Sequence, residues 1–251
     1  MARTPLGTAL TQSHRKQQLA LRASVVRDVM KLWPAWQPSR PDSYQAFERA
    51  MVLLVQSRSV QSAAISARYY ELFRAADAPG RQVARTVALA AARDEAAIRA
   101  SISVTARAGV YAALGAGQTY EAAMRNGLVR VSGAASRNVL NAGRDTVVNE
   151  VQRDPRAQGW ARVTSAAPCA FCAMLASRGP VYKEDTVDFE AHDHCSCDAE
   201  PAYEGSEWPG QAQEYRKLWQ ETGSLKEFRS ALGRGETSAS DEFFTPNLGR
   251  T

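Results

Sequence analysis

All four cysteines of this 251-residue chain fall within 29 consecutive positions, and two of its three histidines fall in the same stretch. Cys169 and Cys172 form a Cys-x-x-Cys pair, and a second group, His-x-x-Cys-x-Cys, follows after a 19-residue insert. Two tight turns that each point a pair of thiolate or imidazole donors at one centre are typical of tetrahedral zinc. The spacing therefore predicts a metal site with zinc as its occupant.

Six cysteine and histidine donors compete for the four positions of a tetrahedral site. The predicted metal ligands are, in chain order, Cys169, Cys172, His192, Cys195 and Cys197. His192 and Cys195 have the usual two-residue gap, and Cys197 can replace Cys195 as the fourth ligand. His194 is the weakest candidate, and we expect it to lie beside the site or at the surface.

Two other interpretations of the cysteines are two disulfide bonds or four buried free thiols. The N-terminal residues show no apolar segment typical of a signal peptide, so we expect synthesis in the cytoplasm. Reducing conditions there oppose disulfide formation, and inert buried thiols have no reason to cluster in this way. A metal site is therefore the preferred interpretation.

A catalytic zinc keeps one coordination position open and needs an acid–base residue nearby. The Pro-Cys-x-x-Cys at 168–172 matches the second half of the zinc deaminase signature, but its first half, His-x-Glu, is missing upstream, where Arg15 follows His14. A serine protease needs a histidine beside a serine and a carboxylate, and we expect His14 to lie in a frayed N-terminus. No catalytic residue is predicted, and a closed structural metal site is favoured.

The first 153 residues show the periodicity of long, alanine-rich amphipathic helices. Between 16 and 33, apolar residues recur every three or four positions, which predicts a helix that buries the stripe Leu19, Ala23, Val26, Met30 and Trp33. A second helix is expected from Pro41 to a break at 78–80. Further helices are predicted over 81–107, 118–126 and 130–152, with glycines weakening the chain after 107.

The pattern changes at Trp160, where short extended segments and turns replace the helical periodicity. After Pro201 come a linker, a short amphipathic helix around 215–219, one or two turns over 225–232, and a tail from Gly233 that we expect to be flexible. The predicted fold is mainly α. It comprises a helical domain at 1–153, a small zinc-stapled α+β module at 154–203, and a short helix with a flexible C-terminal tail at 204–251.

Charge is distributed unevenly between the two halves of the chain. Residues 1–150 carry 20 basic and 10 acidic side chains, whereas residues 151–251 carry 11 basic and 16 acidic ones. Such an excess of positive charge can attract a polyanion, so a nucleic acid such as DNA is a candidate partner of the basic residues 1–150. No apolar run approaches the ~20 residues of a spanning helix, and no membrane partner is expected.

The motifs of residues 160–201 resemble the MuF domain, the family of phage Mu F-like head morphogenesis proteins of tailed phages. The resemblance is carried by Trp160–Thr164, the run from Cys169 to Gly179, Phe189, His192, Cys195, Cys197 and Pro201. The preceding helices and the segment Leu225–Arg229 are similar in character to versions from phages of actinobacterial hosts. Asp193 and His194 depart from the family, which often has proline and a small polar residue there.

The resemblance implies a minor capsid protein that is present in few copies and associates with the portal protein during procapsid assembly. Scaffold or major capsid protein are further partners that it suggests. The family's metal-type positions carry over to the five ligands predicted above. The protein is then expected in the host cytoplasm during assembly and afterwards in the virion, in the capsid interior or at the portal vertex. Some relatives are called capsid maturation proteases, so cleavage of scaffold or major capsid protein is the alternative hypothesis.

Overall fold

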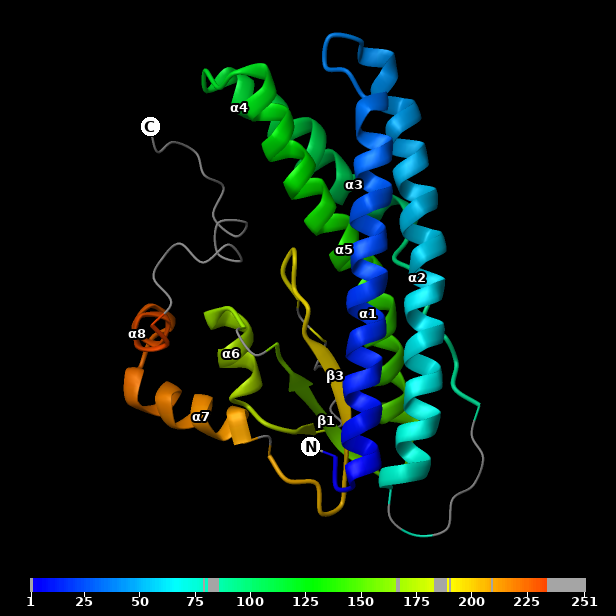
Figure 1. Cartoon of the computed structure of the whole chain (residues 1–251), viewed down its shortest axis with the longest axis vertical. Coiled ribbons are helices and arrows are strands. Elements are labelled where there is room, and N and C mark those ends of the chain that lie inside the picture. Colours follow the sequence, from blue (N-terminus) through cyan, green and yellow to red (C-terminus); the bar gives the residue numbers. More distant parts are fainter. Residues whose placement is uncertain are drawn as a thin grey trace.

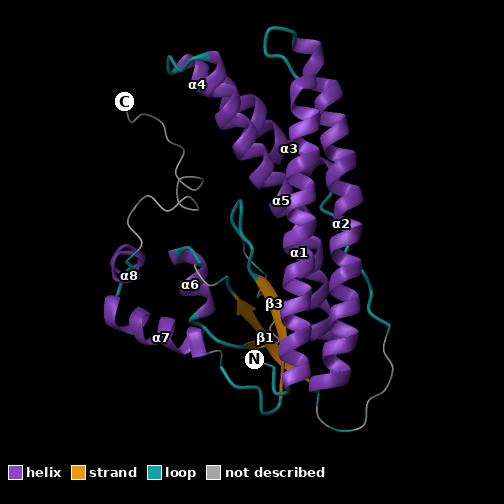
Figure 2. Ribbon diagram, in the orientation of Figure 1, coloured by secondary structure: helices purple, strands orange, loops and turns teal. Residues whose placement is uncertain are grey.

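The computed structural model describes residues 2–78, 80, 86–165, 168–182, 189, 191–208 and 210–233. Its helices are α1 (Pro5–Leu32), α2 (Pro41–Asp77), α3 (Glu95–Ile102), α4 (Gly109–Gly115), α5 (Tyr120–Arg153), α6 (Ala170–Ala176), α7 (Gly210–Thr222) and α8 (Leu225–Ala231). The strands β1 (Ala157–Val163), β2 (Val181–Tyr182) and β3 (Asp198–Tyr203) form one small sheet (Figure 2). The prediction of a mainly α chain with a small α+β module is confirmed.

The long helices form a body with the sheet on one side of it. Helices α1 and α2 lie side by side and antiparallel, α5 packs against both, and α6–α8 lie beyond the sheet (Figure 1). At the far end of α1, Trp33 and Trp36 meet Phe47 of α2, with ring centroids 5.6 and 6.0 Å from the phenylalanine ring. None of the described helices combines the length and the apolar character that crossing a bilayer requires.

Helix α1 starts earlier than the periodicity indicated and buries a different face. Its N-terminus is capped by the Thr4 side chain, which accepts a hydrogen bond from the Gly7 amide at 2.9 Å. The buried side chains of α1 are Gly7, Thr11, His14, Gln18, Leu21, Val25 and Val29. The prediction that Leu19, Ala23, Val26 and Met30 form the buried stripe is wrong. Three of these seven residues are polar, and hydrophobic periodicity cannot detect them.

Buried polar side chains join α1 to α2. His14 Nε2 lies 2.9 Å from Ser66 Oγ, and its ring stacks on Tyr69 at 4.3 Å between centroids. Gln18 donates to the Ser62 carbonyl oxygen at 3.1 Å and accepts from the Ser62 hydroxyl at 2.9 Å. These hydrogen bonds satisfy Gln18, Ser62 and Ser66, which the helix interface removes from water, whereas His14 Nδ1 has no hydrogen-bond partner among the described residues. The expectation that His14 lies in a frayed terminus is therefore wrong.

The helices between residues 41 and 153 follow the predictions in part. The second helix runs from Pro41 to Asp77 as expected. The helix predicted over 81–107 begins only at Glu95, after an Asp94 cap; residues 86–94 are not helical, and 81–85 lie outside the described residues. The two helices predicted over 118–126 and 130–152 form the single helix α5. Gly127, between the two predicted helices, permits close packing of α5 against α4, because a Cβ there would lie 2.4 Å from Val110 of α4.

The sheet has the order β2-β1-β3, with both neighbours antiparallel to β1. Extended segments at β1 and β2 were predicted, but β3 was not. Pro201 lies within β3, opposite Trp160. Because β3 is at the edge of the sheet, a residue without an amide hydrogen is tolerated there.

One hydrophobic cluster includes side chains from both the helical body and the sheet module. It joins Tyr70, Phe73, Val147 and Val151 to Trp160, Tyr203 and all four cysteines. A smaller cluster holds α6, α7 and α8 together, and the helices expected after residue 210 are both present. The domain boundaries at 153/154 and 203/204 stay predictions, and the tail from 234 onward lies outside the described residues.

Candidate metal centre

The first two cysteines lie at the start of α6. Cys169 is the N-cap residue of this helix, and its sulfur accepts a hydrogen bond from the Cys172 amide at 3.4 Å. An N-cap side chain turns back over the first helical turn, so both sulfurs lie on the same side of the helix start. The Cys-x-x-Cys spacing therefore corresponds to a cap and a first-turn position, a local structure that the sequence analysis described only as a turn.

The other three donors come from the loop that leads into β3. The Cys195 amide donates to the His192 carbonyl oxygen at 3.1 Å, which closes a turn. His194, within this turn, has φ of +63°, the left-handed region that non-glycine residues rarely occupy. The Cys197 amide then approaches the Cys195 sulfur at 3.5 Å, just before β3 begins. This turn folds His192 and Cys195 back toward the start of α6.

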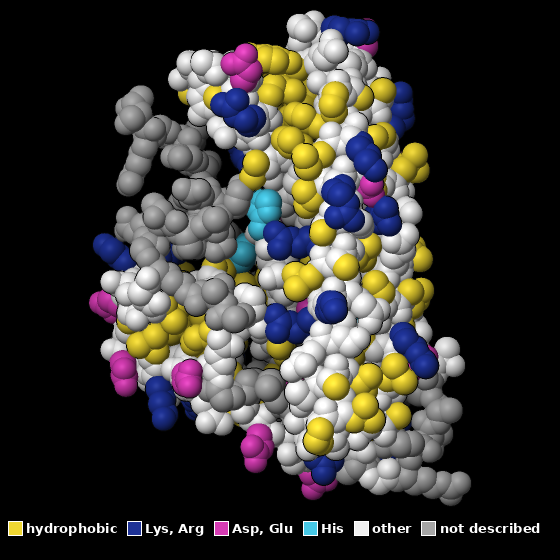
Figure 3. Space-filling model, viewed as in Figure 1, with side chains coloured by type: hydrophobic (Ala, Val, Ile, Leu, Met, Phe, Trp, Pro, Cys, Tyr) yellow, Lys and Arg dark blue, Asp and Glu magenta, His cyan; other side chains and the backbone are white. Residues whose placement is uncertain are grey.

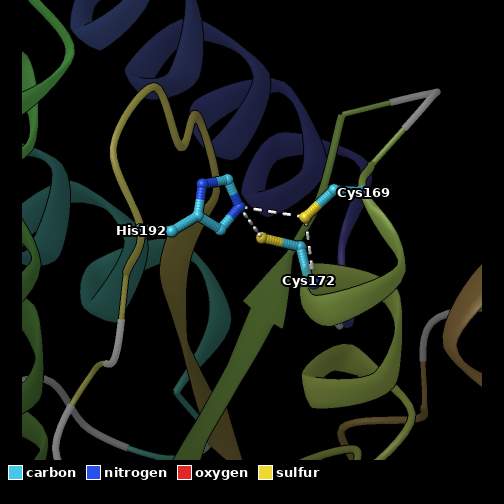
Figure 4. A group of neighbouring side chains, drawn as sticks. All are labelled: Cys169, Cys172 and His192. Carbon is cyan, nitrogen blue, oxygen red and sulfur yellow. Dashed lines mark hydrogen bonds between the residues drawn. The ribbon is translucent and has the colours of Figure 1, made fainter. Parts of the chain in front are cut away.

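The two segments place five donor atoms in two overlapping groups. Cys169, Cys172 and His192 form one group, and Cys172, Cys195 and Cys197 form the other; within each group the ligand atoms lie within 4.8 Å of one another. Figure 4 shows the His192 ring facing the sulfurs of Cys169 and Cys172. All five side chains are buried. The predicted ligands are therefore close together in the fold.

The distance between the sulfurs of Cys172 and Cys195 is close to that of a tetrahedral zinc site. His192 Nε2 lies 2.9 Å from the Cys169 sulfur and 3.3 Å from the Cys172 sulfur, and the sulfurs of Cys172 and Cys195 lie 3.6 Å apart. Two thiolates at ~2.3 Å from one tetrahedral zinc are separated by about 3.8 Å. A disulfide needs a sulfur–sulfur distance of about 2.05 Å, and all four cysteines are free. These groups are compatible with zinc.

The His192 ring is oriented for coordination through Nε2. Its Nδ1 lies 2.6 Å from the Asp193 carbonyl oxygen. A hydrogen bond to a carbonyl assigns the proton to Nδ1 and leaves the Nε2 lone pair for a metal, the arrangement usual for ligating histidines. Figure 4 shows this nitrogen directed at the two sulfurs.

Proton sharing among the donors favours partial ionisation. A hydrogen bond from Cys172 lowers the pKa of Cys169 to about 5, and the same hydrogen bond raises the pKa of Cys172. Burial lowers the pKa of His192, but its hydrogen bond to Cys169 and the charges of Cys169 and Cys195 outweigh burial and raise it to about 9. In this buried group, the protons on Cys172 and His192 stabilise the negative charge of the Cys169 thiolate. A divalent cation that binds here takes over this role and displaces these protons.

A buried arginine of α5 holds the second ligand loop. The Arg144 guanidinium donates to the carbonyl oxygens of Cys197 at 2.9 Å and Cys195 at 3.0 Å. A third hydrogen bond, to Asn141 at 2.8 Å, fixes the guanidinium on the helix. The Phe189 ring lies against this group, with the Arg144 guanidinium carbon 5.1 Å from its centroid. Arg144 therefore connects the helical body to the backbone that presents two of the donors.

Two further contacts dock the same loop on α5. Asp193 forms an ion pair with Arg137 at 3.1 Å. His194 packs against Gly133 so closely that a Cβ at this glycine would lie 2.3 Å from the imidazole Nε2. Among the described residues, His194 belongs to neither donor group, and burial lowers its pKa to about 4. Its place beside the site agrees with the expectation from the sequence.

The α5 residues that support the loop could not be identified from the sequence. Arg144, Arg137 and Gly133 precede the loop by some 50 to 60 positions, and each occurs in a helix with many similar residues. No spacing rule connects them to the cysteines. Only their buried or close contacts in the fold identify them.

Comparisons with known proteins agree with a phage origin for chains of this type. The family model described as VG15 protein matches residues 8–222, which include most of α1, all of α2–α7 and the whole Cys-His centre. The Gene 15 protein of Mycobacterium phage D29 is 31% identical over 146 residues, which cover 43% of this chain and 52% of that protein. The chain thus spans about half the length of this relative. No solved structure matches this chain significantly.

Proposed function

This chain belongs to the VG15 protein family, and from that premise we propose that it is a minor capsid, or head morphogenesis, protein of a tailed phage. In this proposal a few copies associate with the portal protein, enter the procapsid during assembly in the host cytoplasm, and stay in the virion. The similarity to a mycobacteriophage protein and the MuF-like motifs around the cysteines support the assignment.

The observation that carries a structural role is the enclosure of the Cys-His centre. Its side chains are buried, and hydrogen bonds from Arg144 hold the loop of Cys195 and Cys197 against α5. A cage with more donors than a tetrahedral ion needs leaves no evident position for a substrate. We propose that zinc binds there and fastens the sheet module to the helical body, with Cys169, Cys172 and His192 as ligands and Cys195 or Cys197 as the fourth.

Zinc binding is tested by replacing the two neighbouring histidines separately. We expect the purified chain to contain one zinc per molecule, and His192→Gln to lose most of it and to melt at lower temperature. His194→Gln is the matched control, because this histidine lies outside both donor groups, and it should keep its zinc. Zinc content by elemental mass spectrometry and melting by circular dichroism are the measurements. Equal zinc content in the two variants would contradict the ligand assignment.

The head morphogenesis role is tested on particles. Quantitative mass spectrometry of purified procapsids and mature heads of the parent phage should find the chain at a few copies per portal ring. Deleting its gene should reduce the yield of filled heads while the major capsid protein is still made. Absence of the chain from both kinds of particle would contradict the proposal.

The alternative, a capsid maturation protease, gains no support from the histidine outside the centre. His14 is 3% exposed, and the serine beside it, Ser66, is fully buried between α1 and α2. Co-expression with scaffold and major capsid protein tests the alternative directly, since a protease would shorten one of them. Intact partners after co-expression would remove this hypothesis.

A further inference from the structure

The apolar stripe that was predicted to be buried in α1 faces outward instead. Leu19 and Met30 are 42% and 54% exposed, Ala23 is exposed, and Val26 is half-buried between them. Their spacings of four, three and four residues place them along one face of the helix. Helix α1 is therefore apolar on two sides, and only the opposite side, with Leu21, packs against the rest of the chain.

Basic side chains border this stripe on both sides. With 100° of rotation per residue, Arg15 and Arg22 fall on one edge of the stripe. The other edge carries Lys16, Arg27 and Lys31, all of them exposed. In Figure 3, yellow hydrophobic side chains and dark-blue basic ones alternate over the part of the surface that α1 occupies in Figure 1. From Arg15 to Lys31 the face is about 24 Å long at 1.5 Å per residue.

The net positive charge is larger on this helix than on α2 or α5. Helix α1 has five basic residues and one acidic residue, a net charge of +4, whereas α2 has four of each. The acidic residue, Asp28, already forms an ion pair with Arg58 of α2 at 2.6 Å. On the edge near the sheet module, the buried Arg22 Nε has no hydrogen-bond partner among the described residues. Arg15 lies 3.9 Å from Asp198 of β3, and Lys31 lies 4.0 Å from Asp28. Among the described residues, Lys16 and Arg27 form no ion pair, so the positive charge without an acidic neighbour lies on their edge of the apolar stripe.

We propose that this face of α1 is the docking surface for an acidic amphipathic helix of a partner protein. Apolar residues at positions i, i+4, i+7 and i+11 are the contacts that one helix offers to another. The exposed basic edge, with Lys16 and Arg27, requires glutamate or aspartate on the facing flank of the partner's apolar stripe, because such pairs set orientation and partner choice. The proposal deepens the assembly function by naming the chemistry of the partner, and it depends on α1 rather than on the metal centre.

A second copy of the chain and a nucleic acid fit this face less well. Two α1 faces that each carry the exposed positive charges of Lys16 and Arg27 repel one another when they pack together. A phosphate backbone neutralises the basic edges but leaves Leu19 and Met30 without an apolar contact. An acidic helix satisfies both the stripe and the edges.

Binding to designed peptides tests the proposal. The probes are two labelled 21-residue helical peptides with the same leucine stripe, one flanked by glutamates and the other by lysines. Fluorescence anisotropy with the full chain should show binding of the glutamate peptide, weakened by added salt, and at least tenfold weaker binding of the lysine peptide. Equal binding of the two peptides, or no binding of the glutamate peptide, would overturn the proposal.

Matched variants on two helices locate the contact. The double variant Leu19→Gln, Met30→Gln should weaken binding of the glutamate peptide at least tenfold, as expected when central apolar contacts are lost. The control is Leu53→Gln, Val60→Gln on α2, where both residues are also exposed, by 66% and 57%, and seven positions apart. It should bind as the parent chain does. Because all four residues are exposed, circular dichroism should show both variants folded.

The same variants separate this proposal from the other occupants and from the assembly function. Equal loss of binding in the α1 and α2 variants would overturn the proposal, and so would a dimer in sedimentation that only the α1 variant abolishes. Duplex DNA that binds the parent chain and the α1 variant equally, without competing with the glutamate peptide, would leave the proposal supported. If the chain is found in phage heads but does not bind the glutamate peptide, only the docking surface is wrong. If it binds the peptide but is absent from heads, only the assembly function is wrong.

Discussion

Replacing Arg144 by methionine tests whether the helical body holds the loop of Cys195 and Cys197 in place. The arginine is 2% exposed, and it donates hydrogen bonds to the carbonyl oxygens of Cys195 and Cys197 and to Asn141. Methionine keeps much of the apolar volume of the side chain but supplies no donor. The change therefore removes the hydrogen bonds and leaves the packing largely intact.

The expected cost follows from the carbonyl groups that lose their donor. A buried acceptor left unsatisfied costs about 1–3 kcal/mol, so two of them cost about 4 kcal/mol near the middle of the range. For a chain of this length, 1 kcal/mol lowers Tm by about 2–4 °C, which gives a decrease of about 8–16 °C. The loop also presents two metal donors, and losing a group that orients ligands typically weakens metal affinity by about 10- to 100-fold.

The assay compares two variants of the same helix. Arg125→Met is the control, since Arg125 is an exposed arginine of the same helix; its free energy of unfolding should change by less than about 0.5 kcal/mol. Thermal melting and zinc competition with a chromogenic chelator give the two quantities. If Arg144→Met melts and binds zinc as Arg125→Met does, Arg144 does not hold the loop of Cys195 and Cys197 in place.

Three further outcomes are expected. Separate Cys195→Ser and Cys197→Ser variants should differ in zinc affinity by at least tenfold, because a tetrahedral ion takes only one of them as fourth ligand; equal affinities would contradict a single four-ligand site. Gly133→Ala should destabilise the chain, since the new Cβ would lie 2.3 Å from His194, and adding His194→Ala should restore most of the lost stability. Burial lowers the pKa of His14 to about 3 from 6.5, so the unfolded chain takes up a proton that the folded chain does not between these values. Stability should then fall by up to about 1.4 kcal/mol per pH unit below pH 6.5, and His14→Gln should flatten this slope in urea unfolding at pH 7 and pH 5.

The helices were predictable where local signals are strong. Proline and aspartate at 41–42 start α2 as expected, and Pro34 lies in the turn that ends α1. The predictions of secondary structure were wrong where tertiary packing outweighs the local preference of a residue. Two helices were expected over 118–126 and 130–152, yet Gly127 lies inside the single helix α5, where Val110 and Trp33 approach too closely for any side chain. Similarly, Pro201 argued against a strand at 198–203, but β3 tolerates a proline because it is an edge strand.

The donors of the candidate metal centre were predictable for a different reason. Cys169 and Cys172 are three residues apart, and His192 and Cys195 are also three apart, so short-range geometry alone brings each pair together. The pairing of the two segments is a tertiary event. It depends on α5, whose Arg144 holds the second segment against the helical body.

Taken alone, the sequence determined the identity of the donors, the helical character of the first 153 residues and the excess of positive charge in the first half, because each is a property of composition or of near neighbours. Tertiary structure decided which side of α1 is buried. The helix has apolar residues on two sides, and hydrogen bonds of His14 and Gln18 to α2 select the side with Leu21. Periodicity measures how apolar a face is, but burial depends on the free energy of the whole interface, polar groups included.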